Sequence, residues 1–281
     1  MERLTILAPA LLGITFLLVM FGVYSLLCAL GRAPTVTGLE RRRFSELFGP
    51  YMVRYALWMI RPLERALVVG GVTPNMITLL SVTMCMGSGA AIATGHLATG
   101  AWLYAFAGVT DILDGRLARA TGKQSQAGAL VDSVADRWGE LAVFTGCAWY
   151  LRHDGWLLTA MLALAGSMMV SYTRARGEGL GLKLDGGMMQ RAERMFVVAV
   201  GSMVGAWFAA TPSQVDYAQP ALGTALILCG ALASFTALGR WLEGYKALLA
   251  AAQPDELRER REARAERPAE NPMRITGEHT A

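Results

Sequence analysis

Long apolar stretches alternate with short charged ones along most of the chain. Seven stretches are apolar over about 20 residues or more, the length that an α-helix needs to cross the hydrocarbon core of a bilayer. They cover residues 4–30, 74–95, 98–119, 127–151, 155–175, 193–212 and 220–242. The pattern predicts an all-α polytopic membrane protein with one transmembrane helix at the N-terminus and six more from residue 74 onward. We expect that helix to be an uncleaved anchor, because it has no clear small-residue cleavage site.

Residues 51–69 have a different pattern, that of an amphipathic helix. Arg54, Arg61 and Arg65 fall on one helical face, and aromatic and aliphatic residues crowd much of the remainder. This distribution is typical of a helix that lies in the plane of the membrane interface. The alternative is a short helix in a cytoplasmic core. We expect Pro62 to kink or break the helix.

Composition agrees with a membrane protein and excludes other classes. Hydrophobic residues make up 54% of the chain and charged residues only 17%, with a mean hydropathy of +0.37. A soluble domain has about 25% charged residues. The four cysteines lie inside apolar stretches without metal-ligand spacing, so we interpret them as buried hydrophobic residues.

Basic residues are concentrated in the connections that this pattern places on one side of the membrane. The segments 31–73, 116–125, 174–194 and 240–281 hold twenty-three of the twenty-six lysines and arginines. The positive-inside rule therefore places the N-terminus outside and the C-terminus in the cytoplasm, in a cytoplasmic (inner) membrane. This bias accounts for the net charge of +4 without a nucleic-acid partner.

The same patterns divide the chain into four parts. Residues 1–31 form the transmembrane anchor and residues 32–73 a cytoplasmic segment with the interfacial helix. Residues 74–250 form the six-helix domain. Residues 251–281 form a charged cytoplasmic tail, for which we expect a solvated helix and then an irregular end.

Carboxylates in the interior of the predicted spans lie on two consecutive helices. They are Asp111, Asp114, Asp132, Asp136 and Glu140. A charge at membrane depth costs several kcal/mol unless it is paired or hydrated, so such residues are functional candidates.

Helical periodicity places the aspartates on two facing stripes. At 100° per residue, the first stripe holds Asp111, Asp114, Gly115, Ala118 and Arg119, and the second holds Gly128, Asp132 and Asp136. The short basic connection between the two helices makes them antiparallel, so the stripes face each other near the cytoplasmic end.

Four facing carboxylates repel one another unless cations lie between them. Hard divalent ions with oxygen ligands, Mg²⁺ or Mn²⁺, are the natural partners. Gly115 and Gly128 leave room for a ligand near the backbone, and Arg119 offers a planar fork for phosphate. Two metal ions held by carboxylates suit an in-line displacement at phosphorus, and a carboxylate left partly free can accept a proton.

The segment 111–136 carries the pattern D-x-x-D-G-x-x-A-R-x₈-G-x-x-x-D-x-x-x-D. This pattern resembles the full signature of the CDP-alcohol phosphotransferases, integral membrane enzymes of phospholipid headgroup synthesis. The resemblance extends over residues 51–250 and implies an interfacial amphipathic helix followed by a six-helix transmembrane core, to which the N-terminal transmembrane helix would be an addition.

The resemblance implies a role for each signature residue. Asp111, Asp114, Asp132 and Asp136 would bind two divalent cations, and Asp136 would also act as general base. The CDP-lipid site would comprise Asp111, Asp114, Gly115, Ala118, Arg119, Ser125 and Gly128. An alcohol would attack the lipid-linked phosphate of a CDP-lipid such as CDP-diacylglycerol and release CMP. The family also implies a homodimer.

Basic residues beside this site bear on the identity of the acceptor alcohol. Arg174, Arg176, Arg191 and Arg194, with Lys183, gather at the cytoplasmic mouth. They suit a phosphorylated acceptor, because arginine forks bind phosphate well. The alternative is plain positive-inside charge that flanks two helices.

The strings SYTRARGE and QRAER, together with VDSVADR, are similar to the phosphatidylinositol-phosphate synthase branch, which implies inositol phosphate as acceptor. Glycerol 3-phosphate, the acceptor of a phosphatidylglycerophosphate synthase, is the alternative.

Two hypotheses of other classes deserve comparison. An intramembrane cation transporter also places aspartates in spans, but it predicts them in several helices near the midplane. A scaffold without catalysis has no use for four buried aspartates.

Glu140 continues the carboxylate stripe outside the signature, where a hydrogen bond to the site is favoured over metal ligation.

Overall fold

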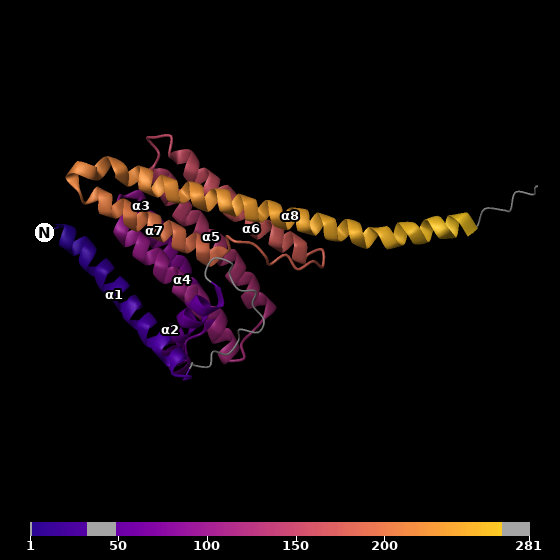
Figure 1. Ribbon diagram of the computed structural model, residues 1–281, viewed down its shortest axis with the longest axis horizontal. Coiled ribbons are helices and arrows are strands. Elements are labelled where there is room, and N and C mark those ends of the chain that lie inside the picture. Colours follow the sequence, from indigo (N-terminus) through magenta and orange to yellow (C-terminus); the bar gives the residue numbers. More distant parts are fainter. Residues whose placement is uncertain (1, 33–48, 266–281) are drawn as a thin grey trace, which may run out of the picture. The chain divides into compact units, whose positions relative to one another are not determined.

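The computed structural model describes residues 2–32 and 49–265, and every regular element in these ranges is helical (Figure 1). The elements are α1 (Glu2–Ala29), α2 (Gly49–Val69), α3 (Pro74–Ala93), α4 (Leu97–Ala120), α5 (Gln126–Tyr150), α6 (Leu157–Glu178), α7 (Arg191–Ala209), a 3₁₀ turn η1 (Pro212–Tyr217) and α8 (Ala218–Ala265). Residues 1–240 form one compact unit and residues 241–281 a second. The predicted all-α class is confirmed.

Most predicted spans agree with a helix to within a few residues, and two expectations differ. Pro62 lies inside α2, so the expected break does not occur, while the expected kink stays a prediction. The Pro62 side chain is exposed. The tail helix that we expected from about residue 253 is the last part of α8 rather than a separate element, because helix-favouring alanine, leucine and lysine continue the helix past the apolar stretch.

Three segments of the described chain are long and apolar enough to cross a membrane by length and composition alone. They are Pro74–Ala93, Arg191–Ala209 and Pro212–Ala251. Helices α4 and α5 carry the signature aspartates, which lower their hydropathy. Both are packed against other helices: α4 lies against α3 and α7, and α5 lies against α3 and α6.

Glycines allow α3 and α5 to cross at backbone contact. A Cβ atom added at Gly146 would collide with the carbonyl of Gly89, and one added at Gly89 would collide with the backbone of Ala142. Small residues at helix crossings are typical of membrane proteins, where close backbone approach replaces the hydrophobic effect as a source of affinity between helices. Ser88 adds a hydrogen bond from its Oγ to the carbonyl of Gly100 in α4 at 2.8 Å.

Helix α2 packs against α4, the first helix of the signature. Leu57 and Ile60 are buried against Leu113 and Leu117. On the same side, Glu64 accepts a hydrogen bond from Arg116 at 2.7 Å, and both side chains are largely shielded from solvent. Because α2 buries one face in this way, its position relative to the signature is fixed by packing and by one ion pair.

Helix α1 covers another part of α2 through aromatic residues. The ring of Tyr24, which is buried, lies beside the rings of Tyr51, Tyr55 and Trp58 at 5.4 to 5.7 Å between centroids. The hydroxyl of Tyr55 donates to the carbonyl of Leu17 at 2.6 Å. The N-terminal helix thus contacts the rest of the chain partly through α2.

The glycine crossing predicts a difference between two glycine-to-alanine variants. Gly146→Ala places a methyl group against the backbone of α3, and overpacking of this kind costs about 1–3 kcal/mol. We expect a lower midpoint of thermal unfolding in detergent. Gly239→Ala is the matched control, because nothing lies within 4 Å of its added Cβ and alanine favours a helix over glycine by about 1 kcal/mol. Equal unfolding midpoints for the two variants would contradict the backbone contact.

Candidate active site

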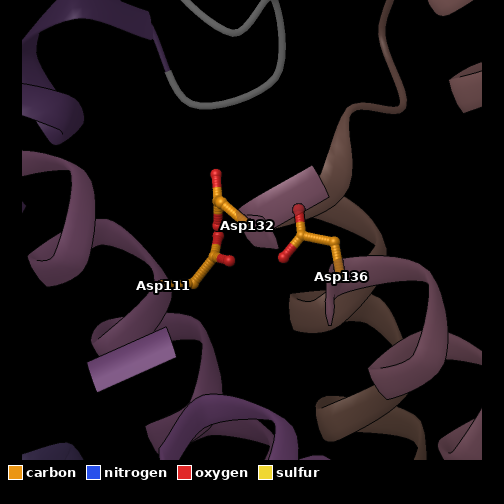
Figure 2. Close-up of side chains that lie close together, drawn as sticks. All are labelled: Asp111, Asp132 and Asp136. Atoms are coloured by element: carbon orange, nitrogen blue, oxygen red, sulfur yellow. The ribbon is translucent and has the colours of Figure 1, made fainter. Parts of the chain in front are cut away.

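Three aspartates form a carboxylate cluster between α4 and α5. Asp111 comes from α4, and Asp132 and Asp136 come from successive turns of α5. Each offers a carboxylate oxygen, and these oxygens lie within 4.8 Å of one another. Figure 2 shows the three side chains pointing toward a common centre. The facing stripes predicted from helical periodicity therefore bring these three residues together.

Asp114 belongs to the predicted set but lies outside this cluster. Its side chain is buried, and its Oδ2 accepts a hydrogen bond from Thr78 Oγ1 in α3 at 2.9 Å. The carboxylate of Asp114 thus has a polar partner from a third helix. No spacing in the sequence pointed to Thr78, because the contact joins residues 36 positions apart.

Arg191, the first residue of α7, reaches into the carboxylate cluster. Its Nε lies 3.3 Å from Asp111 Oδ1, and its Nη2 lies 3.0 Å from Asp136 Oδ1. The side chain is only 13% exposed. One guanidinium thus links three helices and balances part of the negative charge of two aspartates. The sequence placed Arg191 near the site but did not show this contact.

Glu140 lies one helical turn beyond Asp136 and is fully buried. Its Oε1 accepts from Arg194 Nη2 at 2.6 Å, and its Oε2 accepts from Ser167 Oγ at 2.7 Å. Arg194 is 1% exposed and also donates to the carbonyl of Met189 at 3.1 Å. Arg194 therefore points into the helix bundle, whereas the sequence predicted it at the cytoplasmic mouth.

The other predicted acceptor residues lie at the surface. Arg174 and Arg176 are exposed in the last turns of α6. Arg174 forms an ion pair with Glu178 at 2.9 Å. Ion pairs between exposed side chains contribute little stability, so a stronger anionic ligand can replace such a partner.

The residues predicted for the CDP-lipid site surround the turn between α4 and α5. Ser125 is the N-cap of α5, and its Oγ accepts from the backbone N–H of Gly128 at 3.0 Å. A Cβ added at Gly115 would lie 3.5 Å from Arg119 Nη1, so the Arg119 side chain passes close over this glycine. Ala118 is half-buried on the same helix. All of these residues flank the end of α4 or the start of α5.

The carboxylate cluster has the donor set of a hard divalent cation. All three candidate ligands are carboxylates, and oxygen ligands are those that Mg²⁺ and Mn²⁺ prefer. None of the three candidate ligands is a cysteine or a histidine, and all three aspartates are half-buried. A site of this kind is suited to a metal ion that also binds an anionic substrate.

A family model and individual relatives of known name agree on the kind of protein that this chain resembles. Residues 71–236 match the family model described as CDP-alcohol phosphatidyltransferase. The phosphatidylinositol phosphate synthase of Mycolicibacterium smegmatis is 34% identical over 147 residues, which cover 50% of this chain and 66% of that protein. The archaetidylinositol phosphate synthase of Methanothermobacter thermautotrophicus is 34% identical over 174 residues, covering 60% of this chain and 80% of that protein.

Solved structures of the Mycobacterium tuberculosis phosphatidylinositol phosphate synthase share the fold. The form with CDP-DAG bound has a TM-score of 0.56 at 30% identity, and it covers 66% of this chain and 92% of that one. The complex with manganese and citrate has a TM-score of 0.57, also at 30% identity, with 66% and 88% covered.

The protein is accordingly an all-helical enzyme that crosses the membrane several times. The family model covers more than half of the chain and includes every signature residue from Asp111 to Asp136. The chain belongs to the CDP-alcohol phosphatidyltransferase family.

Proposed function

We propose that the protein transfers the phosphatidyl group of a CDP-lipid such as CDP-diacylglycerol to a hydroxyl of inositol phosphate and releases CMP. The observation that carries this proposal is the carboxylate cluster of Asp111, Asp132 and Asp136 with Arg191 beside it. The relatives named as phosphatidylinositol phosphate synthases, one of them solved with CDP-DAG, support the choice of substrates.

Asp111, Asp114, Asp132 and Asp136 would hold two divalent cations, Mg²⁺ or Mn²⁺. Three of these side chains already converge, and the manganese complex of the M. tuberculosis synthase supports the choice of ion. When bound, such ions neutralise the charge of the diphosphate and of the phosphoryl group in transfer.

Gly115, Ala118, Arg119, Ser125 and Gly128 would bind the cytidine-diphosphate part of the donor. The two glycines lie where a ligand can approach the backbone of α4 and α5. Arg119 and the backbone N–H groups at the start of α5 are donors for phosphate oxygens.

The reaction needs a proton acceptor near the acceptor hydroxyl. Its oxygen attacks the lipid-linked phosphorus, a new P–O bond forms, the bond to CMP breaks, and the hydroxyl proton passes to Asp136. Asp136 sits at the edge of the cluster with Arg191 Nη2 at 3.0 Å and Arg137 Nη2 at 3.6 Å. These contacts hold the carboxylate oxygens of Asp136 beside those of Asp111 and Asp132.

The acceptor phosphate would be bound by Arg174, Arg176 and Arg191. Arg191 joins the cluster to the start of α7, and the other two are exposed at the end of α6. Arg194, which we predicted as a fourth ligand, has Glu140 as its partner, so we leave it out of the phosphate-binding set.

Glycerol 3-phosphate would also suit the arginines and is the alternative acceptor. The names of the relatives favour inositol phosphate. A cation transporter has less support, because the carboxylate cluster is confined to two adjacent helices.

We further propose that the enzyme lies in the cytoplasmic membrane with its active site toward the cytoplasm, its N-terminus outside and its C-terminus inside. The distribution of lysine and arginine supports this orientation. The homodimer that the family resemblance implies stays a prediction.

Release of CMP from CDP-diacylglycerol tests the proposed function. The purified full chain would be given inositol phosphate, glycerol 3-phosphate, inositol or serine in turn, with Mg²⁺ or Mn²⁺. We expect CMP release with inositol phosphate and little with the neutral or zwitterionic acceptors. Preference for glycerol 3-phosphate would establish the alternative, and no CMP with any acceptor would overturn the proposal.

Asp136→Asn tests the general base. The amide keeps the size of the side chain but cannot accept the hydroxyl proton, so we expect CMP release to fall by about 10²- to 10⁴-fold in a protein that still folds. Asp216→Asn, at an exposed position in η1, is the matched control. Activity close to that of the wild type in Asp136→Asn would refute the assignment.

Asp132→Asn tests the metal site without reference to activity. Loss of one carboxylate ligand should weaken Mn²⁺ binding by about tenfold or more, since even changes around a metal ligand cost 10- to 100-fold. Free Mn²⁺ in equilibrium with the purified protein is measured by electron paramagnetic resonance. Asp216→Asn serves again as control, and equal Mn²⁺ affinities would remove Asp132 from the ligand set.

A further inference from the structure

Glu140 is a charged residue that the signature does not include, yet it is completely buried in the described structure. Its carboxylate joins three helices, since Ser167 comes from α6 and Arg194 from α7. These contacts bridge 27 and 54 positions of sequence. A carboxylate in such a place needs partners for both oxygens, and here both oxygens have one.

Stability alone gives little reason for an ion pair at this position. Two charges buried together lose hydration, and well-packed apolar residues of similar volume often replace such a pair without loss of stability. Besides Ser167 and Arg194, two further guanidinium groups lie near the Glu140 carboxylate, with Arg137 Nε at 4.0 Å and Arg191 Nη1 at 3.9 Å. The pair therefore calls for a reason beyond packing.

Arg194 connects Glu140 to the segment that leads into α7. Besides Glu140, its guanidinium donates to the carbonyl of Met189 at 3.1 Å. Met189 lies directly before Gln190, the N-cap of α7, and Arg191 follows as the first helical residue. By holding this carbonyl, the Glu140–Arg194 pair fixes the backbone from which Arg191 extends.

Glu140 also acts on Arg191 directly. Arg191 Nη1 lies 3.9 Å from Glu140 Oε1, while its Nη2 lies 3.0 Å from Asp136 Oδ1. The guanidinium thus sits between a buried anion and the carboxylate cluster. The buried Nη1 makes no hydrogen bond among the described residues, so it interacts with Glu140 through charge.

We propose that Glu140 is a positioning residue for the acceptor phosphate. It holds Arg191 at the carboxylate cluster, directly through charge and indirectly through Arg194 and the Met189 carbonyl. The inference rests on the proposed function, in which Arg191 binds the phosphate of the acceptor. It assigns Arg194 to the support of that site and not to phosphate contact.

Glu140→Gln tests the proposal, because the amide keeps the shape of the side chain and removes its charge. We expect the KM for inositol phosphate to rise by about tenfold, because a guanidinium that is no longer held at the cluster binds the acceptor phosphate less well. The KM for CDP-diacylglycerol should change by less than about twofold, because other residues would bind the donor. Glu243→Gln, exposed on α8, is the matched control.

A double variant separates positioning from folding. Glu140→Leu with Arg194→Leu removes both charges and fills the space with apolar side chains, so the thermal unfolding midpoint should stay near that of the wild type. The KM for inositol phosphate should remain raised, because the support of Arg191 is still missing. Recovery of the wild-type KM in the double variant would overturn the proposal, as would equal rises in both KM values for Glu140→Gln.

Binding of inositol phosphate without CDP-lipid supplies a readout besides turnover. Calorimetry should show about tenfold weaker binding to Glu140→Gln than to the wild type, which corresponds to about 1.4 kcal/mol. Equal binding would overturn the positioning role. Absence of CMP release by the wild type, with the difference in binding intact, would overturn the proposed reaction but not the phosphate site.

Discussion

The constraint on which this structure depends is the burial of carboxylates inside an apolar helix bundle. An ionised aspartate or glutamate among apolar side chains is tolerated only when cations or hydrogen-bond donors surround it. The chain meets this requirement from α7, whose first turn carries Arg191 and Arg194, and from hydroxyl groups on α3 and α6. The packing of α3, α6 and α7 around α4 and α5 brings these groups to the carboxylates.

Close packing of small residues makes this arrangement possible. Where Gly89 and Gly146 meet, α3 and α5 approach to backbone contact, and α4 is joined to α3 by the hydrogen bond from Ser88. Helix α3 packs against both α4 and α5, and aspartates from these two helices reach a common centre. Longer acidic side chains would reach across wider gaps, but with more rotamer freedom to lose and less definite ligand positions.

Much of the fold and part of the site could be predicted because both depend on local periodicity. Runs of apolar residues locate the helices. Angular spacing alone predicts that Asp111 faces Asp132 and Asp136, and the structure brings these three side chains together. The partners of Asp114 and Arg194 could not be predicted in this way, because Thr78 and Glu140 are distant in sequence and meet them only through tertiary packing. Periodicity states which face a side chain occupies, but not which neighbour that face meets.

The contact between α2 and α4 limits how far the chain can be shortened and still form the active site. The matched family region begins at residue 71, after α2 has ended. A chain cut at that boundary would expose Leu113 and Leu117 and would leave Arg116 without the counter-charge of Glu64. The catalytic module is therefore larger than the matched family region, and α2 belongs to it as much as the helices that bear the aspartates.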